Sequence, residues 1–420
     1  MSEARRALLP DAALPLTYFV GAHVALALAA GALVLDPALP GAFHYHPRMI
    51  AVVHLVTLGW ISASILGAFY IVAPLALGMP FAARVSDRVA CAAYWIGTLG
   101  MVSGFWRADY TQVGIASIGV IWGLGLVAAR ALIGLRTARL PGGVSLHVAL
   151  AFGNVLLAGV IGAVFAAGRT SGLVTVSPMA LAGAHAHLAV IGWAVMMIFG
   201  VSYRLVPMFL PAAMPVGRGL YTSAVLLEVG ALGIAAALLA GVSPAPWALC
   251  VVAAFLAFAR QARQILRQRR PRPHEMQGRD WSTWQTHVAL LYMIVASGLG
   301  IWLALGRAPA SVIWAYGVAG LLGYISQTVV GIQGRLLPLL GWYRAMAQRD
   351  GEPPPRSAHR LTSGWATLGI LVAWLAAVPL LGAGLMSERP AAIATGAALL
   401  LASTVLQAWH MGVIVRRAVA

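Results

Sequence analysis

The sequence is short of charge and has no lysine. Charged residues make up 9% of its 420 residues, 11 of them acidic, and all 28 basic residues are arginine. Its two cysteines, Cys91 and Cys250, occur without a CxxC or CxxCH pattern, which excludes a thiol redox motif and covalent c-type haem. No A-x-A-like site follows the first apolar run, so we expect a retained helix rather than a cleaved signal peptide. No loop is long enough for a soluble domain, so any soluble redox partner is expected from another chain.

Apolar residues are what the chain has instead. They make up 61% of the sequence, and the mean hydropathy is +0.86. Successive apolar runs are about 20 residues long, enough to cross a bilayer. The fold class predicted is therefore an all-α polytopic membrane protein surrounded by lipid. Twelve spans are expected, near 15–36, 48–79, 86–106, 112–135, 145–168, 179–209, 216–240, 243–266, 284–306, 309–341, 361–383 and 390–415.

The net charge of +17 follows the predicted topology and does not indicate nucleic-acid binding. Between these spans, 23 arginines fall on one side of the membrane or at its border, many of them in the segment 260–280. The positive-inside rule places this side and both termini in the cytoplasm, as in a bacterial-type inner membrane. Anionic lipid binding is the alternative role of that segment. The five arginines predicted on the other side are Arg48, Arg107, Arg169, Arg307 and Arg389.

One helical pattern occurs three times. HLVTLGWISASILGAFYIVAPLALG from His54 matches HLAVIGWAVMMIFGVSYRLVPMFLP from His187 without a gap, so one constant offset aligns the two copies. A third copy, VAGLLGYISQTVVGIQGRLLPLLGW, begins at Val318, which stands in place of the histidine. An HVAL segment opens the preceding span in each case. The sequence thus predicts one membrane domain, 1–420, built from three pseudo-equivalent four-helix units at about 1–140, 141–280 and 281–420.

Two histidines of this pattern are the main candidate ligands. His54 and His187 are predicted in the outer half of the membrane, where an imidazole needs a partner, a metal or a haem. His185 is two residues before His187, so on a helix it points about 200° away and is expected to serve a neighbour or a second metal. The rings expected to flank a flat ligand are Trp60, Trp193, Tyr70 and Tyr203.

Other polar residues in or near the spans are weaker candidates. The HVAL histidines His23, His147 and His287 are predicted in the inner half as further metal ligands. Glu228, the acid deepest in a span, is either a proton-transfer group or a protonated structural hydrogen-bond partner. The outer-loop residues His44 and His46 are candidates to extend a metal site.

Two arginines occupy equivalent places near the predicted cytoplasmic face. Arg204 and Arg335 are candidates to pair with haem propionates. The alternative is that they reach out to the membrane interface, as long basic side chains commonly do.

Twelve spans in three units with a histidine on the second span resemble the haem–copper oxidase subunit I superfamily, in particular its short, divergent members. The paired HLxxxGW motifs are also similar to haem–copper membrane proteins of the nitric-oxide response. The resemblance implies that His54 ligates a haem b, with copper as a further cofactor.

The resemblance also has departures. The family carries a histidine pair on helix 7 and two more histidines on helix 10. Here these spans read YTSAVLLEVGALG and YGVAGLLGYISQTVV, without histidine. An intact oxygen-reducing binuclear centre is therefore not expected.

The function predicted is a haem b-binding membrane protein in electron transfer or in nitric oxide or oxygen handling. His54 and His187 would ligate one haem together or two haems separately. Electrons would come from quinol, a cytochrome c or another membrane subunit, and the chain is an oxidoreductase if it is an enzyme. One alternative is a transition-metal or small-solute transporter, because polar residues in repeated membrane units are also typical of transporters. The other is a non-catalytic assembly scaffold.

Overall fold

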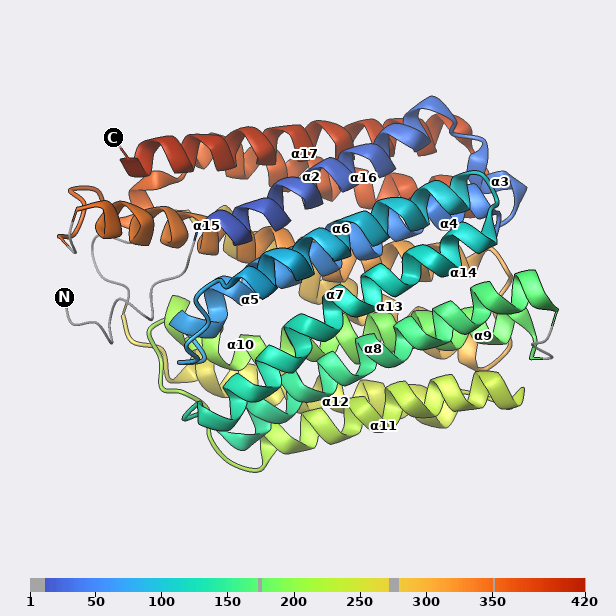
Figure 1. Cartoon of the computed structure of the whole chain (residues 1–420), viewed down its shortest axis with the longest axis horizontal. Helices are drawn as coiled ribbons and strands as arrows, with labels where there is room; N and C mark the ends of the chain where they lie inside the picture. The colour runs from blue at the N-terminus through green and yellow to red at the C-terminus, as the bar shows by residue number, and fades with distance from the viewer. Residues whose placement is uncertain (1–11, 173–175, 272–278, 350–351, 420) are drawn as a thin grey trace.

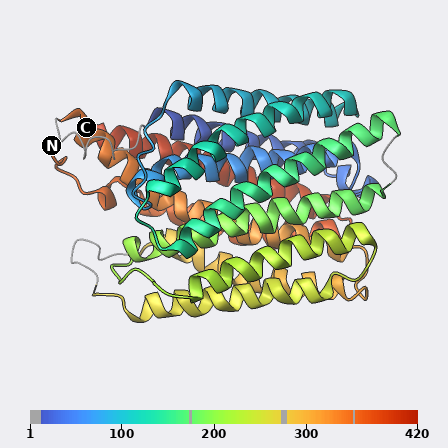
Figure 2. The same ribbon diagram turned by 60° about the horizontal axis from the view of Figure 1, so that its bottom comes forward.

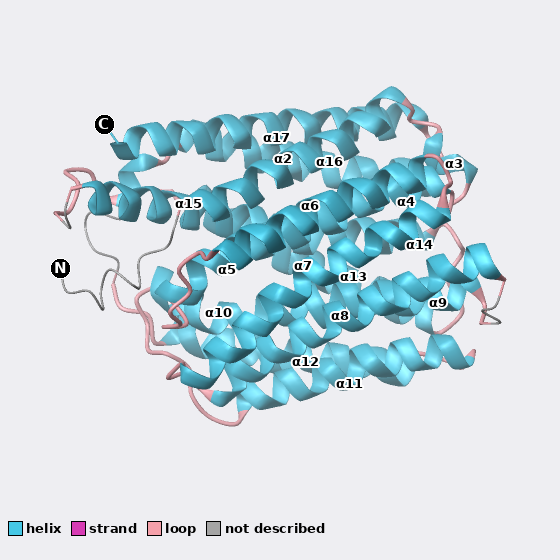
Figure 3. Cartoon of the chain, in the orientation of Figure 1, coloured by secondary structure: helices cyan, strands magenta, loops and turns pink. Residues whose placement is uncertain are grey.

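The structure, a computed structural model, describes residues 12–172, 176–271, 279–349 and 352–419. Within these ranges every regular element is a helix (Figure 3). A helix pairs its backbone N–H and C=O groups with one another, which is necessary in a membrane because hydrocarbon offers them no hydrogen-bond partners. Twelve helical rods are long and apolar enough to cross a membrane. The chain is a multi-pass membrane protein, and the predicted all-α fold with twelve spans is confirmed.

The spans follow the predicted ranges closely. The largest difference is at the end of the tenth span, predicted at 341 and found at Gln348. The first four spans are α2 (Ala13–Leu35); α4 (Pro47–His54), η1 (Leu55–Ser62) and α5 (Ala63–Leu75) in one rod; α6 (Val85–Trp106); and α7 (Tyr110–Thr137). The next four are α8 (Gly142–Ser171); α9 (Pro178–His187), η2 (Leu188–Val195) and α10 (Met196–Phe209) in one rod; α11 (Gly219–Ala240); and α12 (Ala245–Arg267). The last four are α13 (Trp281–Ala304); α14 (Val312–Gly317), η4 (Val318–Ser326) and α15 (Gln327–Gln348) in one rod; α16 (Gly364–Met386); and α17 (Pro390–Val419). Two short helices, α3 (Leu39–Ala42) and η5 (Ala358–Leu361), lie between spans.

The long helices run roughly along one common direction, and their connections gather at the two ends of the bundle (Figures 1 and 2). The start of α2 and the end of α17 lie at the same end (Figure 1). That is the arrangement an even number of spans requires.

The three spans that carry the repeated sequence motif, called the motif rods below, are α4–η1–α5, α9–η2–α10 and α14–η4–α15. Each of them contains a π-helical stretch, which the sequence analysis did not predict. These stretches are η1, η2 and η4, and they begin directly after His54, directly after His187 and at Val318. A π-helix is rare and is often found at functional sites. Its recurrence at matching positions agrees with the sequence repeat, while the equivalence of the three whole units in space stays a prediction.

The three motif rods form the centre of the bundle. Within an apolar stretch of 18 residues in each rod, 67%, 61% and 61% of the residues are buried inside the protein. The same share is 17% for α12 and 11% for α13. Direct bonds join them: the Trp193 indole donates to the Ser62 hydroxyl over 3.1 Å, and the Gln333 amide donates to the Ser64 hydroxyl over 3.0 Å. The main candidate histidines, His54, His185 and His187, therefore stand on two of the three most buried rods.

Candidate functional site

The structure brings His54 together with His185. Their ring centres are 6.2 Å apart and the ring planes differ by 21°. His54 ends α4, while His185 lies in the last turn of α9, on the face turned toward α8. The Phe105 ring of α6 lies 4.9 Å from the His54 ring. The site is thus enclosed by residues from α4, α6, α8 and α9.

Backbone carbonyls hold both rings by the same nitrogen. Nδ1 of His54 lies 2.9 Å from the Ile50 carbonyl oxygen, and Nδ1 of His185 lies 2.8 Å from that of Ala158. A carbonyl oxygen only accepts, so each Nδ1–H is the donor. In the neutral ring the lone pair then belongs to Nε2. Metal-binding histidines are commonly oriented in this way, by donating the other ring N–H to a carbonyl.

His187 has a different neighbour, Tyr316 of α14. Their ring centres are 6.1 Å apart at an interplanar angle of 24°, and the tyrosine hydroxyl lies 3.4 Å from Nε2 of His187. Nδ1 of His187 bonds to the Gly183 carbonyl over 2.8 Å. His185 and His187 therefore contact different helices, as their two-residue spacing on α9 requires.

The two pairs occupy matching positions of the repeat. The alignment that sets His187 against His54 and Val318 against His187 also sets Tyr316 against His185. Both pairs also have nearly the same ring separation and ring angle. The same alignment defines a third pair of matching positions, which Val318 and Val52 occupy. Neither valine has an atom that can bind a metal. The match of Tyr316 to His185 was present in the sequence, but His185 lacked a histidine counterpart and the pairing was missed.

The aromatic rings predicted to flank a ligand make protein contacts elsewhere. Trp60 packs edge-on against His23 with ring centres 5.2 Å apart, and the indole of Trp193 bonds to Ser62. The Tyr70 hydroxyl donates to Asp87 over 3.0 Å. The Tyr203 hydroxyl lies 2.8 Å from the Ser223 hydroxyl. In the structure these four rings fill helix interfaces away from the His54–His185 pair.

Glu228 has a buried amide partner. The Asn154 side-chain amide donates to Oε2 of Glu228 over 2.6 Å and to the Gly192 carbonyl over 3.2 Å. Asn154 therefore links Glu228 on α11 to the π-helical stretch η2. It also stands one turn before Ala158 on α8, whose carbonyl holds His185. The sequence analysis missed Asn154 because a lone asparagine in an apolar helix has no repeat counterpart.

The three HVAL histidines lie in different surroundings. His23 is buried against Trp60, whereas the buried His147 has its Nε2 3.2 Å from the Ser223 hydroxyl and packs against Tyr203. His287 is exposed on α13 and lies edge-on to Trp284. His23 and His147 share one contact, because Nδ1 of each lies 2.7 Å from the carbonyl oxygen of the residue four positions before it, but the other neighbours of the three rings differ.

The remaining polar candidates lie apart from the pair. His44 lies near Trp314, with ring centres 6.1 Å apart. Burial lowers the pKa of His44, so its neutral form is favoured. Arg335 pairs with Asp280, and Nε of Arg204 donates to the Ala76 carbonyl over 2.9 Å. Both arginines thus have protein partners.

The donor set limits which metal group the pair can hold. In the described ranges, no three His, Cys, Asp or Glu side chains converge as metal ligands. A site with two imidazoles suits haem iron, which takes its other four ligands from the porphyrin, and it also suits two-coordinate copper(I). The residues present therefore fit a haem by ligand number and type.

Comparison with protein families and with curated proteins finds no match to this chain. The inference about function therefore depends on the geometry of the site.

Proposed function

We propose that this chain is a haem b-binding membrane protein of the haem–copper oxidase-like type, with His54 and His185 as the residues that would hold the haem. The supporting observation is the paired imidazoles with ring centres 6.2 Å apart. Two imidazoles on one metal have ring centres at most roughly 6 Å apart, for metal–nitrogen bonds of about 2.0–2.1 Å and ring centres about 1 Å behind each nitrogen. The carbonyl bonds at Nδ1 leave Nε2 of each ring as the ligand atom.

A haem b held by both histidines would supply one-electron chemistry, and if it were held by only one of them it could also bind a diatomic gas. The chain's own part is to orient two nitrogens and to surround them with apolar helices. The proposed role is electron transfer or nitric oxide or oxygen handling in the bacterial-type inner membrane. Electrons would come from quinol, a cytochrome c or a partner subunit.

The test is a dithionite-reduced minus oxidised spectrum of the detergent-purified protein, with pyridine-haemochrome quantification. We expect a b-type spectrum that is reduced several-fold or lost in His54→Ala and in His185→Ala. The control is His359→Ala, which changes a histidine of η5 outside the spans. Unchanged haem content and spectra in both pair variants would contradict the assignment.

Copper(I) is the second candidate, because no third His, Cys, Asp or Glu side chain in the described part of the chain converges on the two imidazoles. Elemental analysis of the same samples separates the cases. Stoichiometric copper without haem, removed by His54→Ala, would assign the pair to copper and support the transport alternative. Absence of both after expression with adequate haem and copper would favour the scaffold alternative.

A further inference from the structure

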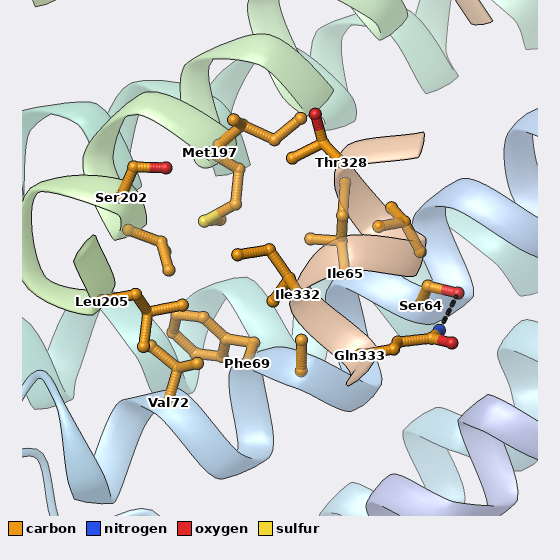
Figure 4. A pocket seen from close by; sticks show the side chains of 14 residues that line it. Ser64, Ile65, Phe69, Val72, Met197, Ser202, Leu205, Thr328, Ile332 and Gln333 are labelled. Carbon is orange, nitrogen blue, oxygen red and sulfur yellow. Dashed lines mark hydrogen bonds between the residues drawn. The ribbon is translucent and has the colours of Figure 1, made fainter. Parts of the chain in front are cut away.

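An apolar cavity lies between the three central helices α5, α10 and α15 (Figure 4). Its volume is about 60 Å³. The lining contains no histidine and no charged residue. The cavity is therefore distinct from the His54–His185 pair. Ser64, on its wall, comes ten residues after His54, or roughly 15 Å along a helix at 1.5 Å per residue.

The three helices contribute matching positions of the repeat to the cavity wall. Ser64, Met197 and Thr328 form one such set, in the alignment that matches His54, His187 and Val318. Phe69, Ser202 and Gln333 form another in the same alignment. The cavity is thus where the three copies of the motif meet. The wall has hydroxyl or amide groups on some copies and apolar side chains on others.

Of the four polar side chains on the wall, three have partners, and the Ser202 hydroxyl has no hydrogen bond within the described residues. The Gln333 amide donates to the Ser64 hydroxyl over 3.0 Å, and the Thr328 hydroxyl donates to the Tyr324 carbonyl over 2.8 Å. A buried water needs two to four polar partners, whereas apolar cavities remain dry and accept apolar guests. An engineered apolar cavity of about 150 Å³ binds benzene or xenon. A space of 60 Å³ is suited to a smaller guest, of one or a few heavy atoms.

We propose that this cavity binds a single small apolar gas molecule, of the class that includes diatomic gases and xenon. The ligand is selected by size and by an almost entirely apolar wall, since the Ser202 hydroxyl alone is fewer than the two to four polar partners that a buried water needs. Binding needs no haem and no metal. The inference goes beyond the proposed function, and either of the two can fail without the other.

The probe is xenon, applied under pressure to crystals of the full-length protein and followed in solution by the chemical shift of dissolved ¹²⁹Xe. We expect one anomalous xenon peak between α5, α10 and α15. We expect Val201→Phe, which places a ring in the cavity, to abolish the peak and the saturable part of the shift. The matched control is Val225→Phe on the exposed face of α11, where Val225 is 51% exposed, and it should retain both.

A second variant covers the case in which Val201→Phe does not fold. Ala68→Leu fills the cavity from α5 with a smaller side chain and should lower xenon occupancy at least several-fold. The proposal is overturned if xenon is absent from the cavity at saturating pressure, or if ordered water occupies it. It is also overturned if the folded cavity variants bind xenon as the control does.

Discussion

At the scale of single residues, the pairing of His54 with His185 gives different surroundings to the two histidines of α9, His185 and His187. His185 joins His54, whereas His187 lies against the Tyr316 hydroxyl, 3.4 Å from its Nε2. A phenol beside a ligand nitrogen competes with a metal for the same lone pair. The two matching pairs therefore differ in chemistry, and only the first offers two imidazoles.

This difference predicts unequal effects of two histidine substitutions. His187→Ala should leave the haem content of the His54–His185 pair close to that of the wild type, because it removes no ligand of that pair. His185→Ala should reduce it several-fold. Haemochrome assays on both variants make the comparison. If His187→Ala removes as much haem as His185→Ala, the two histidines serve one site.

Glu228 is our candidate for a group that couples a proton to the pair. It connects through Asn154 to η2, and Asn154 precedes by one turn the carbonyl that holds His185. We expect Glu228→Gln to weaken the pH dependence of the haem midpoint potential, which for one proton per electron is about 59 mV per pH unit. The measurement is a redox titration between pH 6 and pH 9. Asp36→Asn, which changes an exposed acid after α2, is the control, and equal slopes in all three proteins would exclude Glu228.

At the scale of elements, close approach between helices depends on glycine at the π-helical stretches. A β-carbon on Gly59 would lie 2.4 Å from the Ala25 β-carbon, and one on Gly192 would lie 2.7 Å from Cγ of Asn154. In contrast, a β-carbon on Gly320 in η4 meets no atom within 4 Å. The motif glycines of η1 and η2 are therefore required by packing against α2 and α8.

The packing difference predicts opposite results for two glycine-to-alanine changes. Gly59→Ala should destabilise the protein by about 1–3 kcal/mol, the usual cost of overpacking. Gly320→Ala should have no effect or a stabilising one, because alanine is the better helix former. Thermal unfolding in one detergent, read as loss of monodisperse protein, compares them. Equal melting temperatures would mean that α2 moves aside without cost at Gly59.

At the scale of the whole molecule, twelve spans place the two ends of the described bundle on one side. From the excess of arginine on that side we expect it to be cytoplasmic. Ala213 follows α10 on this side, and Ala310 precedes α14 on the opposite side. Both alanines are exposed loop residues, which makes them a matched pair for labelling.

Orientation is checked by cysteine labelling in intact spheroplasts with a membrane-impermeant maleimide. In a background with Cys91 and Cys250 changed to alanine, Ala310→Cys should react and Ala213→Cys should react only after lysis. The reverse pattern would invert the topology, and the His54–His185 pair would then lie in the cytoplasmic half of the membrane.

The sequence by itself determined the membrane class, the number of spans and nearly all their ends, because hydrocarbon thickness fixes the length of an apolar helix. It also indicated the repeat and made His54 a candidate ligand, which stays a prediction. Tertiary structure decided which ring faces His54, because a fixed offset aligns positions within the chain and does not say which helices touch. Only packing among α4, α6, α8 and α9 brings His185 to His54, and only the fold places the cavity among α5, α10 and α15. The π-helical stretches were likewise absent from the prediction, since hydropathy does not distinguish a π-helix from an α-helix.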